Sequence, residues 1–243
     1  MVRSFGTACA FAGALAVAAA QPSFVYKFDA ERAAGVDGSI QIKYAGENSS
    51  SATITASLDF SRVNQSDIVA FDNNCTMDAV TGWKWHIHTK WNSTQSSESF
   101  KQCAKAATAS HYDPLRACGP VSEYNAEPEC TAKIKDYACN PANYSADPLT
   151  CEKGDLSGKF GAFKLAEDAT VAGEWTDEHF PLPSENTESW SIVLHAMCGQ
   201  ESRIACAHRT EAEGDVDQVD QSTPVQDTPE QSTAPSAAAG CGV

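Results

Sequence analysis

The sequence predicts an all-β fold, an antiparallel sandwich or barrel with one long loop braced by disulfides. Three observations support this fold class. Short segments alternate between apolar and polar residues with the period of a half-buried strand. Clusters of Gly, Asn, Asp and Pro separate these segments, and no long segment after the N-terminus has the stripe of an amphipathic helix. The chain also holds 10 cysteines in 243 residues, a number that calls for disulfides or metal thiolates.

The first segment has the features of a secretory signal peptide. A positive start at Arg3 precedes an apolar run over residues 7–20, and the run ends in three alanines that suit cleavage. The run is too short to span a bilayer. We therefore expect residues 1–20 to be removed before Gln21 and the mature chain to enter an oxidising compartment, where its cysteines form disulfides.

One domain is expected over residues 21–209, and its strands follow in chain order. Seven segments show period-two alternation or an enrichment in β-branched and aromatic residues, which is typical of strands. Seven or eight short strands favour an antiparallel sandwich or barrel. The expected strands cover residues 23–30, 39–45, 51–60, 83–91, 159–166, 189–196 and 202–209.

Residues 92–158 interrupt this series of strands. They contain five of the eight cysteines between Cys75 and Cys206, several prolines and little strand pattern. Long irregular loops are uncommon unless they have a function, and disulfides are the means of holding such a loop in place. We expect this segment to be a long, disulfide-braced loop.

The last segment, residues 210–243, predicts a disordered tail. It has seven acidic residues, no basic ones, and many Ser, Thr, Pro and Gln, so it has too little apolar surface to offset its ordering entropy. The domain that precedes it carries 25 acidic and 16 basic residues, a net charge of −9. Nucleic acid would require a basic face, so no nucleic-acid partner is expected.

Five Asn-x-Ser/Thr sequons fit a glycosylated extracellular surface. They lie at Asn48, Asn64, Asn74, Asn92 and Asn143. We expect a secreted glycoprotein without a transmembrane segment, with association to a cell surface or wall left open. A monomer is the expected oligomeric state.

Histidines on the predicted strands indicate a metal site. Alternation along residues 83–91 places His86 and His88 on the face opposite Trp83, Trp85 and Ile87. Two imidazoles two residues apart on a strand converge on one point, which suits a metal in a β-scaffold. Two further candidates are His195, at the end of an apolar strand, and His111, in the long loop, whereas His179 and His208 are expected to be exposed or locally bonded.

Five short fragments, in their order and spacing, resemble the extracellular superoxide dismutases of the copper-zinc superfamily. The resemblance extends from about Gly82 to Ala207 and is weaker over residues 21–81. It implies an eight-stranded Greek-key β-sandwich or barrel, in agreement with the strand pattern. The fragments are His86-Ile87-His88, His111-Tyr112-Asp113-Pro114, Gly154-Asp155-Leu156-Ser157-Gly158, Ile192-Val193-Leu194-His195 and Arg203-Ile204-Ala205-Cys206.

The resemblance also implies a set of site residues. It assigns copper to His86, His88, His111 and His195. His111 and Arg203 are the implied catalytic residues, with Arg203 attracting superoxide beside the metal. It further implies a disulfide between Cys103 and Cys206. We expect the remaining cysteines of the loop to pair among themselves, which leaves Cys75 for Cys198; the loop cysteines are Cys118, Cys130, Cys139 and Cys151.

Departures from the zinc-containing relatives favour the copper-only subgroup. Asp155 is retained, but Ala117 or Cys118, and Glu152, stand where two zinc-binding histidines are expected. A structural zinc site needs four good ligands, so we expect no zinc. The segment between His195 and Arg203 is also short where zinc-containing relatives carry a long loop. Without zinc, carboxylates must orient the imidazoles, and we expect Glu152 to bond the His111 ring and Asp155 to add a supporting hydrogen bond.

The function that the resemblance implies is a secreted, copper-dependent superoxide dismutase. Such an enzyme converts superoxide to dioxygen and hydrogen peroxide by Cu(II)/Cu(I) cycling, without a zinc site. The alternative is a non-enzymatic extracellular module that binds or stores copper on the same fold. Retention of Arg203 together with the four histidines favours catalysis, because storage does not require the arginine.

Overall fold

The computed structural model describes residues 21–76, 80–92 and 99–211. The expected signal peptide and almost all of the expected tail lie outside the described residues, as do the last two residues of the Asn92 sequon. The final strand continues to Glu211, slightly beyond the expected end of the domain at Arg209. In the described part of the chain, no helix is both long enough and apolar enough to cross a bilayer.

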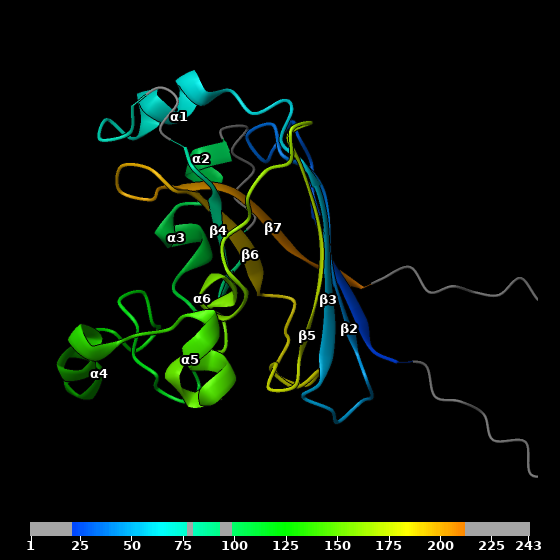
Figure 1. Ribbon diagram of the computed structural model, residues 1–243, viewed down its shortest axis with the longest axis vertical. Helices are drawn as coiled ribbons and strands as arrows, with labels where there is room; N and C mark the ends of the chain where they lie inside the picture. The colour runs from blue at the N-terminus through cyan, green and yellow to red at the C-terminus, as the bar shows by residue number, and fades with distance from the viewer. Residues whose placement is uncertain (1–20, 77–79, 93–98, 212–243) are drawn as a thin grey trace, which may run out of the picture. The chain divides into compact units, whose positions relative to one another are not determined.

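Seven strands form one curled antiparallel sheet, a half-barrel, which confirms the predicted fold class (Figure 1). Their order is β4-β6-β7-β1-β2-β3-β5, so β4 and β5 form the two edges. In Figure 1, β4 and β6 face the layer that contains β2, β3 and β5. The strands are β1 (Ser23–Phe28), β2 (Asp37–Tyr44), β3 (Ala52–Asp59), β4 (Trp83–His88), β5 (Thr170–Asp177), β6 (Ser191–Ala196) and β7 (Arg203–Glu211).

The apolar faces of the strands pack into one core. β2 and β3 alternate between buried and outward side chains over most of their length, as the period of two predicts. The predicted inward residues of β4, Trp83, Trp85 and Ile87, are all buried in this core. The ring of Trp85 stacks on Phe163 with centroids 4.5 Å apart, and its Nε1 donates to the Gly161 carbonyl.

Two features of the sheet differ from the sequence-based prediction. Residues 159–166 are not a strand: helix α6 (Leu156–Phe160) occupies their start, and Phe163 makes only an isolated bridge to Trp83. The Asp155 side chain caps this helix by accepting from the Gly158 N–H, a local bond that overrides the alternating pattern. The second difference is β5, which the sequence analysis did not identify.

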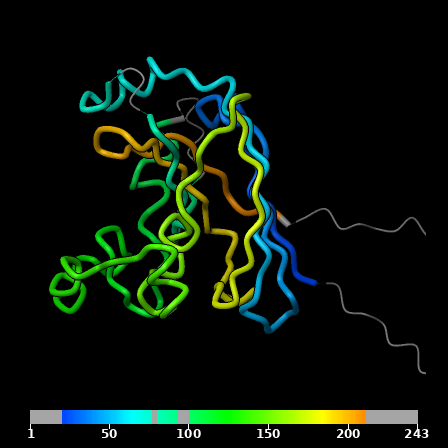
Figure 2. Tube along the Cα trace, viewed as in Figure 1, coloured from blue at the N-terminus to red at the C-terminus, as the bar shows by residue number. Residues whose placement is uncertain are grey.

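Residues 92–158 contain several short helices in place of the irregular loop that was predicted. Figure 2 shows the green chain of this segment winding beside the sheet. The helices there are α2 (Ser99–Gln102), α3 (Lys105–Thr108), α4 (Pro128–Lys133) and α5 (Pro141–Ala146), with 3-10 turns η1 (Ile134–Asp136) and η2 (Pro148–Thr150), while α1 (Gln65–Phe71) lies outside this segment. We call residues 113–151 the insert.

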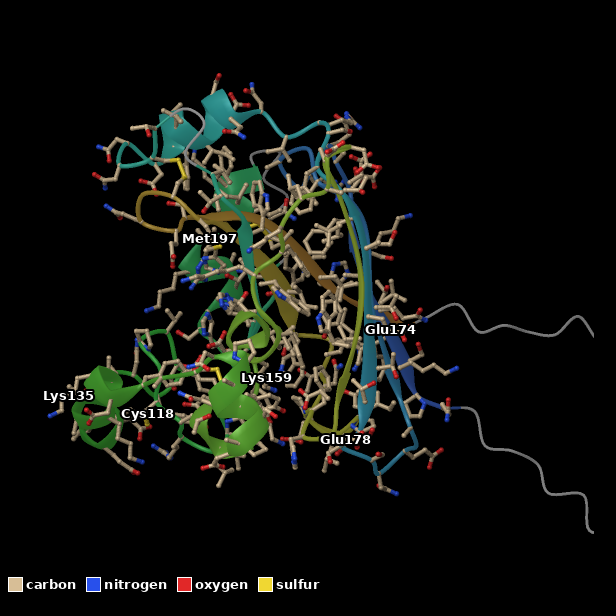
Figure 3. The ribbon with its side chains drawn as sticks, in the orientation of Figure 1. Cys118, Lys135, Lys159, Glu174, Glu178 and Met197 are labelled. Carbon is tan, nitrogen blue, oxygen red and sulfur yellow. A yellow bond between two sulfur atoms is a disulfide. The ribbon has the colours of Figure 1, made fainter. Side chains whose placement is uncertain are left out.

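Four disulfides hold the described cysteines. Cys103 pairs with Cys206, the pairing that the resemblance implies, and Cys75 pairs with Cys198, as expected for the remaining two. The loop cysteines pair among themselves as Cys118–Cys130 and Cys139–Cys151. Figure 3 labels Cys118 and Lys135 in the green insert.

Candidate metal centre

Four histidines from three segments meet on the face of the sheet opposite its core. Each offers one ring nitrogen, and these four nitrogens all lie within 4.8 Å of one another. His86 and His88 come from β4 and His195 from β6, while His111 precedes the insert and forms an isolated backbone bridge with His88. All four are buried. These are the four residues that the resemblance assigns to copper.

Strand register explains why the histidines converge. Lys84 of β4 pairs with His195 of β6, so His195 lies diagonal to His86 on the same face. Across β6, His195 pairs with Arg203 of β7, where a register shift between Leu194 and His195 marks a bulge. Bulges re-aim side chains. The register therefore brings Arg203 next to the histidine group.

The histidine group has the donor atoms that a metal site requires. Among the described residues, the buried side-chain atoms without a hydrogen-bond partner include one ring nitrogen of each histidine: His86 Nδ1, His88 Nε2, His111 Nε2 and His195 Nε2. Leaving a buried polar atom without a partner costs about 1–3 kcal/mol. Four such atoms pointing into one group are explained if they are metal ligands, and neutral imidazole is the commonest metal-binding side chain.

The other nitrogen of each ring faces a fixed partner. His88 Nδ1 lies 3.2 Å from the Ala109 carbonyl and His195 Nδ1 lies 2.9 Å from the Glu201 carbonyl. His111 Nδ1 lies 2.6 Å from Glu152 Oε2, and His86 Nε2 lies 3.4 Å from Asp155 Oδ1. Such contacts fix the tautomer and orientation of a ligating imidazole. Glu152 and Asp155 thus lie beside the rings of His111 and His86, respectively.

Burial keeps the imidazoles neutral. It lowers the pKa of His111 to about 4 and the pKa of both His88 and His195 well below the ordinary value. Burial also raises the pKa of Glu152 well above its usual range, and the charge of Asp155 adds to that rise. A neutral imidazole is the form that binds a metal, so the site is prepared for one at neutral pH.

The segment Gly154-Asp155-Leu156-Ser157-Gly158 is anchored against β4, which holds Asp155 beside the histidines. The Gly154 carbonyl accepts from the Ile87 N–H at 2.8 Å, and the Gly154 N–H donates to the Tyr112 carbonyl at 2.8 Å. A Cβ on Gly154 would lie 2.6 Å from the Ile87 oxygen, so only glycine allows this approach. Ser157 Oγ then accepts from the Trp85 N–H at 2.6 Å, which ties α6 to β4.

Arg203 is held at the rim of the histidine group. Its Nη1 donates to Thr108 Oγ1 at 2.6 Å and to the Ala109 carbonyl at 2.8 Å. Ala109 has a φ of +58°, which is unusual for a residue with a Cβ, and its carbonyl faces both His88 and Arg203. Burial lowers the pKa of Arg203 to about 10, so the group remains cationic at neutral pH.

A cavity of about 690 Å³ opens onto the site. Its lining includes His86, His111, His195, Glu152 and Arg203. Met197, on the loop after β6, also lines it and is labelled in Figure 3. The cavity therefore leads from solvent to the rings of three of the four histidines and to Arg203.

Two residues at the site were missed by the sequence analysis. Ala109 contributes a carbonyl, and no side-chain pattern reveals that role. Tyr137 lines the cavity and contacts both Glu152 and Asp155, but it lies in the insert, where no motif distinguishes it. The two histidines expected to be outside the site, His179 and His208, are both exposed.

A second group of metal-type side chains does not form a metal site. Asp113 lies close to Cys118 and Cys130, but these two cysteines are joined in a disulfide. The Asp113 carboxylate instead accepts from the N–H groups of Ala117 and Cys118, each at 2.8 Å, and from Ser122 Oγ at 2.7 Å. It therefore fixes the turn at the start of the insert.

Comparisons with known proteins support the fold. No protein-family model matches the chain, and no curated protein matches it significantly. Among solved structures, the chain is similar to Candida albicans superoxide dismutase 5 with Cu(II), at 22% identity and a TM-score of 0.49 over 80% of this chain and 95% of that chain. It is also similar to a mutant of the same enzyme, at 22% identity and a TM-score of 0.50 over 81% and 95%. The second likeness shows that this chain shares the fold of superoxide dismutase 5.

Proposed function

We propose that this protein is a secreted, copper-dependent superoxide dismutase that works without a zinc site. Two superoxide ions and two protons would give one dioxygen and one hydrogen peroxide. The observation that carries the proposal is the group of four unpartnered imidazole nitrogens beside Arg203. The shared fold of superoxide dismutase 5 agrees with it.

The donor set fits copper. His86, His88, His111 and His195 would hold the ion through the four nitrogens that lack other partners. Imidazole suits copper among other transition metals, and copper supplies one-electron exchange with superoxide by alternating between Cu(II) and Cu(I). Where zinc-containing relatives would have further histidines, this chain has the oxidised Cys118 and the Glu152 that bonds His111, so we propose that zinc is absent.

Arg203 and His111 would act on the substrate. Superoxide is an anion, and the domain has an excess of acidic residues, so the protein as a whole does not attract it. A cation close to the metal must therefore provide the attraction. The Arg203 guanidinium, which lines the cavity, would bind superoxide and orient it beside the histidines. His111 can hold a proton at Nε2 for transfer to the peroxide product, while Glu152 accepts from Nδ1 and keeps the ring oriented.

Arg203→Ala should slow dismutation while copper stays bound. Electrostatic steering changes association rates by about 10- to 1000-fold, so we expect kcat/KM to fall by at least about tenfold. Pulse radiolysis on copper-loaded protein measures the rate, and metal analysis measures occupancy. Arg62→Ala is the matched control, because Arg62 is an exposed arginine paired with Glu31. Equal rates in the two variants would remove Arg203 from its proposed role.

Glu152→Ala should impair turnover more than copper retention. The His111 ring loses the carboxylate that its Nδ1 contacts, and loss of a carboxylate that orients a metal ligand costs about 10- to 100-fold in metal affinity or activity. Dismutation rates and copper affinity, measured on the same preparation, test the difference. Glu129→Ala, which removes an exposed carboxylate paired with Lys133, should change neither quantity. A Glu152→Ala enzyme with full activity would contradict the role of this carboxylate.

Metal loading of the full chain tests the proposal as a whole. The secreted protein is stripped of metal, offered copper and zinc together, dialysed and assayed for metal content and superoxide removal. One copper per chain with dismutation supports the proposal. One zinc per chain would overturn the zinc-free site, and copper without dismutation would favour a copper-storage module.

A secreted, glycosylated monomer is the state that we propose for the mature chain. Four disulfides within the described residues indicate an oxidising compartment. Four sequon asparagines, Asn48, Asn64, Asn74 and Asn92, are exposed in the structure and accessible to glycan addition. N-terminal sequencing and glycosidase treatment of the secreted protein test cleavage and glycosylation.

A further inference from the structure

The insert delivers one tyrosine to the carboxylates of the metal centre. The Tyr137 hydroxyl donates to Asp155 Oδ2 at 2.8 Å and accepts from the Glu152 N–H at 3.2 Å. Asp155 Oδ1 lies 3.4 Å from His86 Nε2, and Glu152 Oε2 lies 2.6 Å from His111 Nδ1. The Tyr137 phenol therefore contacts both Asp155 and Glu152. These two residues contact the rings of His86 and His111, whereas backbone carbonyls contact the other two rings.

The position of Tyr137 is fixed on three sides. The Cys139–Cys151 disulfide closes the chain between Tyr137 and Glu152, which keeps these two residues adjacent. The Tyr137 N–H donates to the Ile134 carbonyl at 3.2 Å and ends the turn η1. On the third side, a Cβ at Gly119 would lie 2.9 Å from Tyr137 Cζ and 2.3 Å from Glu152 Oε1. The backbone at Gly119 therefore packs closely against the side chains of Tyr137 and Glu152.

We propose that Tyr137 is a positioning residue that orients Asp155 and the Glu152 backbone, and through them the imidazoles of His86 and His111. Its hydroxyl uses its one proton toward Asp155 and a lone pair toward Glu152, so both bonds form together. The insert thus supplies part of the support of the metal centre. We rest this proposal on the copper site proposed above, and the first measurement below does not require copper.

The first test uses metal-free protein with 15N-labelled histidine. Tyr137→Phe should shift the ring-nitrogen resonances of His86 and His111 and leave those of His88 and His195 in place. The latter two rings contact the carbonyls of Ala109 and Glu201 and act as internal controls. Unchanged resonances for all four rings, or equal shifts in all four, would overturn the proposal.

The second test is a double-mutant cycle on Cu(II) affinity. Removing a carboxylate that touches a metal ligand costs about 10- to 100-fold, so a group one contact further away should cost about 3- to 10-fold. Tyr137→Phe should weaken Cu(II) binding by that factor in the wild-type background and by much less in Asp155→Ala, which has no side-chain acceptor for the Tyr137 hydroxyl. Equal losses in both backgrounds would show that Tyr137 does not act through Asp155.

Tyr124→Phe is the matched control for both tests. Tyr124 lies in the same insert, and its ring packs under the Arg116 guanidinium, 4.2 Å from the centroid. Its variant should keep the resonances and the affinity of the wild type, and a Cu(II) spectrum equal to that of wild type. A third outcome is that wild-type protein fails to bind copper while Tyr137→Phe still shifts the His86 and His111 resonances. That result would contradict the proposed copper function and support the positioning role of Tyr137.

Discussion

His88→Ala is expected to abolish copper retention and, with it, dismutation. His88 is fully buried, its Nε2 lacks a partner, and its Nδ1 contacts the Ala109 carbonyl. The variant removes one of four donor atoms, whereas loss of a mere supporting contact already costs about 10- to 100-fold. We therefore expect affinity to fall by more than about 100-fold. Copper per chain after dialysis against a chelator measures the effect.

The control for this variant is His208→Ala. His208 is exposed on β7 and stacks on Trp91 with centroids 5.2 Å apart, away from the four ligands. This variant should keep one copper per chain and wild-type activity. Unfolding of both metal-free variants in urea shows that the fold is retained. A His88→Ala protein that keeps its copper through dialysis would remove His88 from the ligand set.

Lys159→Met is expected to lower the free energy of unfolding by about 3–5 kcal/mol. Lys159 Nζ lies 3.0 Å from Asp177 Oδ2, and their side chains are 1% and 0% exposed. Nζ also donates to the Lys153 carbonyl at 2.8 Å, and Asp177 Oδ1 accepts from the Tyr144 hydroxyl. Removal of the lysine leaves a buried carboxylate without its cation. Figure 3 labels Lys159, which joins helix α6 to strand β5.

Two companion variants show whether the loss arises from the buried charge. Lys159→Met with Asp177→Leu removes both charges and should regain most of the lost stability. Lys133→Met breaks an exposed pair with Glu129 and should cost less than about 1 kcal/mol. Urea unfolding of the oxidised proteins measures all three. If Lys159→Met lowers the free energy of unfolding by less than about 1 kcal/mol, the prediction is wrong, and water or neighbouring groups stabilise the buried charge of Asp177.

The predictions from sequence succeeded where local pattern and tertiary structure agree. On β4, alternation alone separates Trp85 from its histidine neighbours, because one face of that strand meets the core and the other meets the site. The carboxylates beside the histidines followed from the family resemblance and from the need to orient imidazoles. Spacing also left the pairing of the loop cysteines open, and the structure resolves it as two local pairs.

The predictions failed where a single contact outweighs the pattern. Residues 159–166 alternate, but the Asp155 cap and the buried Lys159 hold the start of that segment as a helix. In β5, the strand period is present, but Gly173 stands at an inward position beneath the Trp175 ring, so the pattern loses an apolar residue. Tyr137 reaches the site only through the folding of the insert, which no local pattern encodes.

The disulfides also bear on the order in which the site is assembled. The two pairs within the insert join residues 12 apart, whereas Cys103–Cys206 and Cys75–Cys198 span 103 and 123 residues. Closing a short loop costs less chain entropy, so the insert can be cross-linked while the C-terminal strands are still being synthesised. The long pairs must wait for β6 and β7, which bring His195 and Arg203. Oxidative folding therefore completes last the part of the candidate metal centre that contains His195 and Arg203.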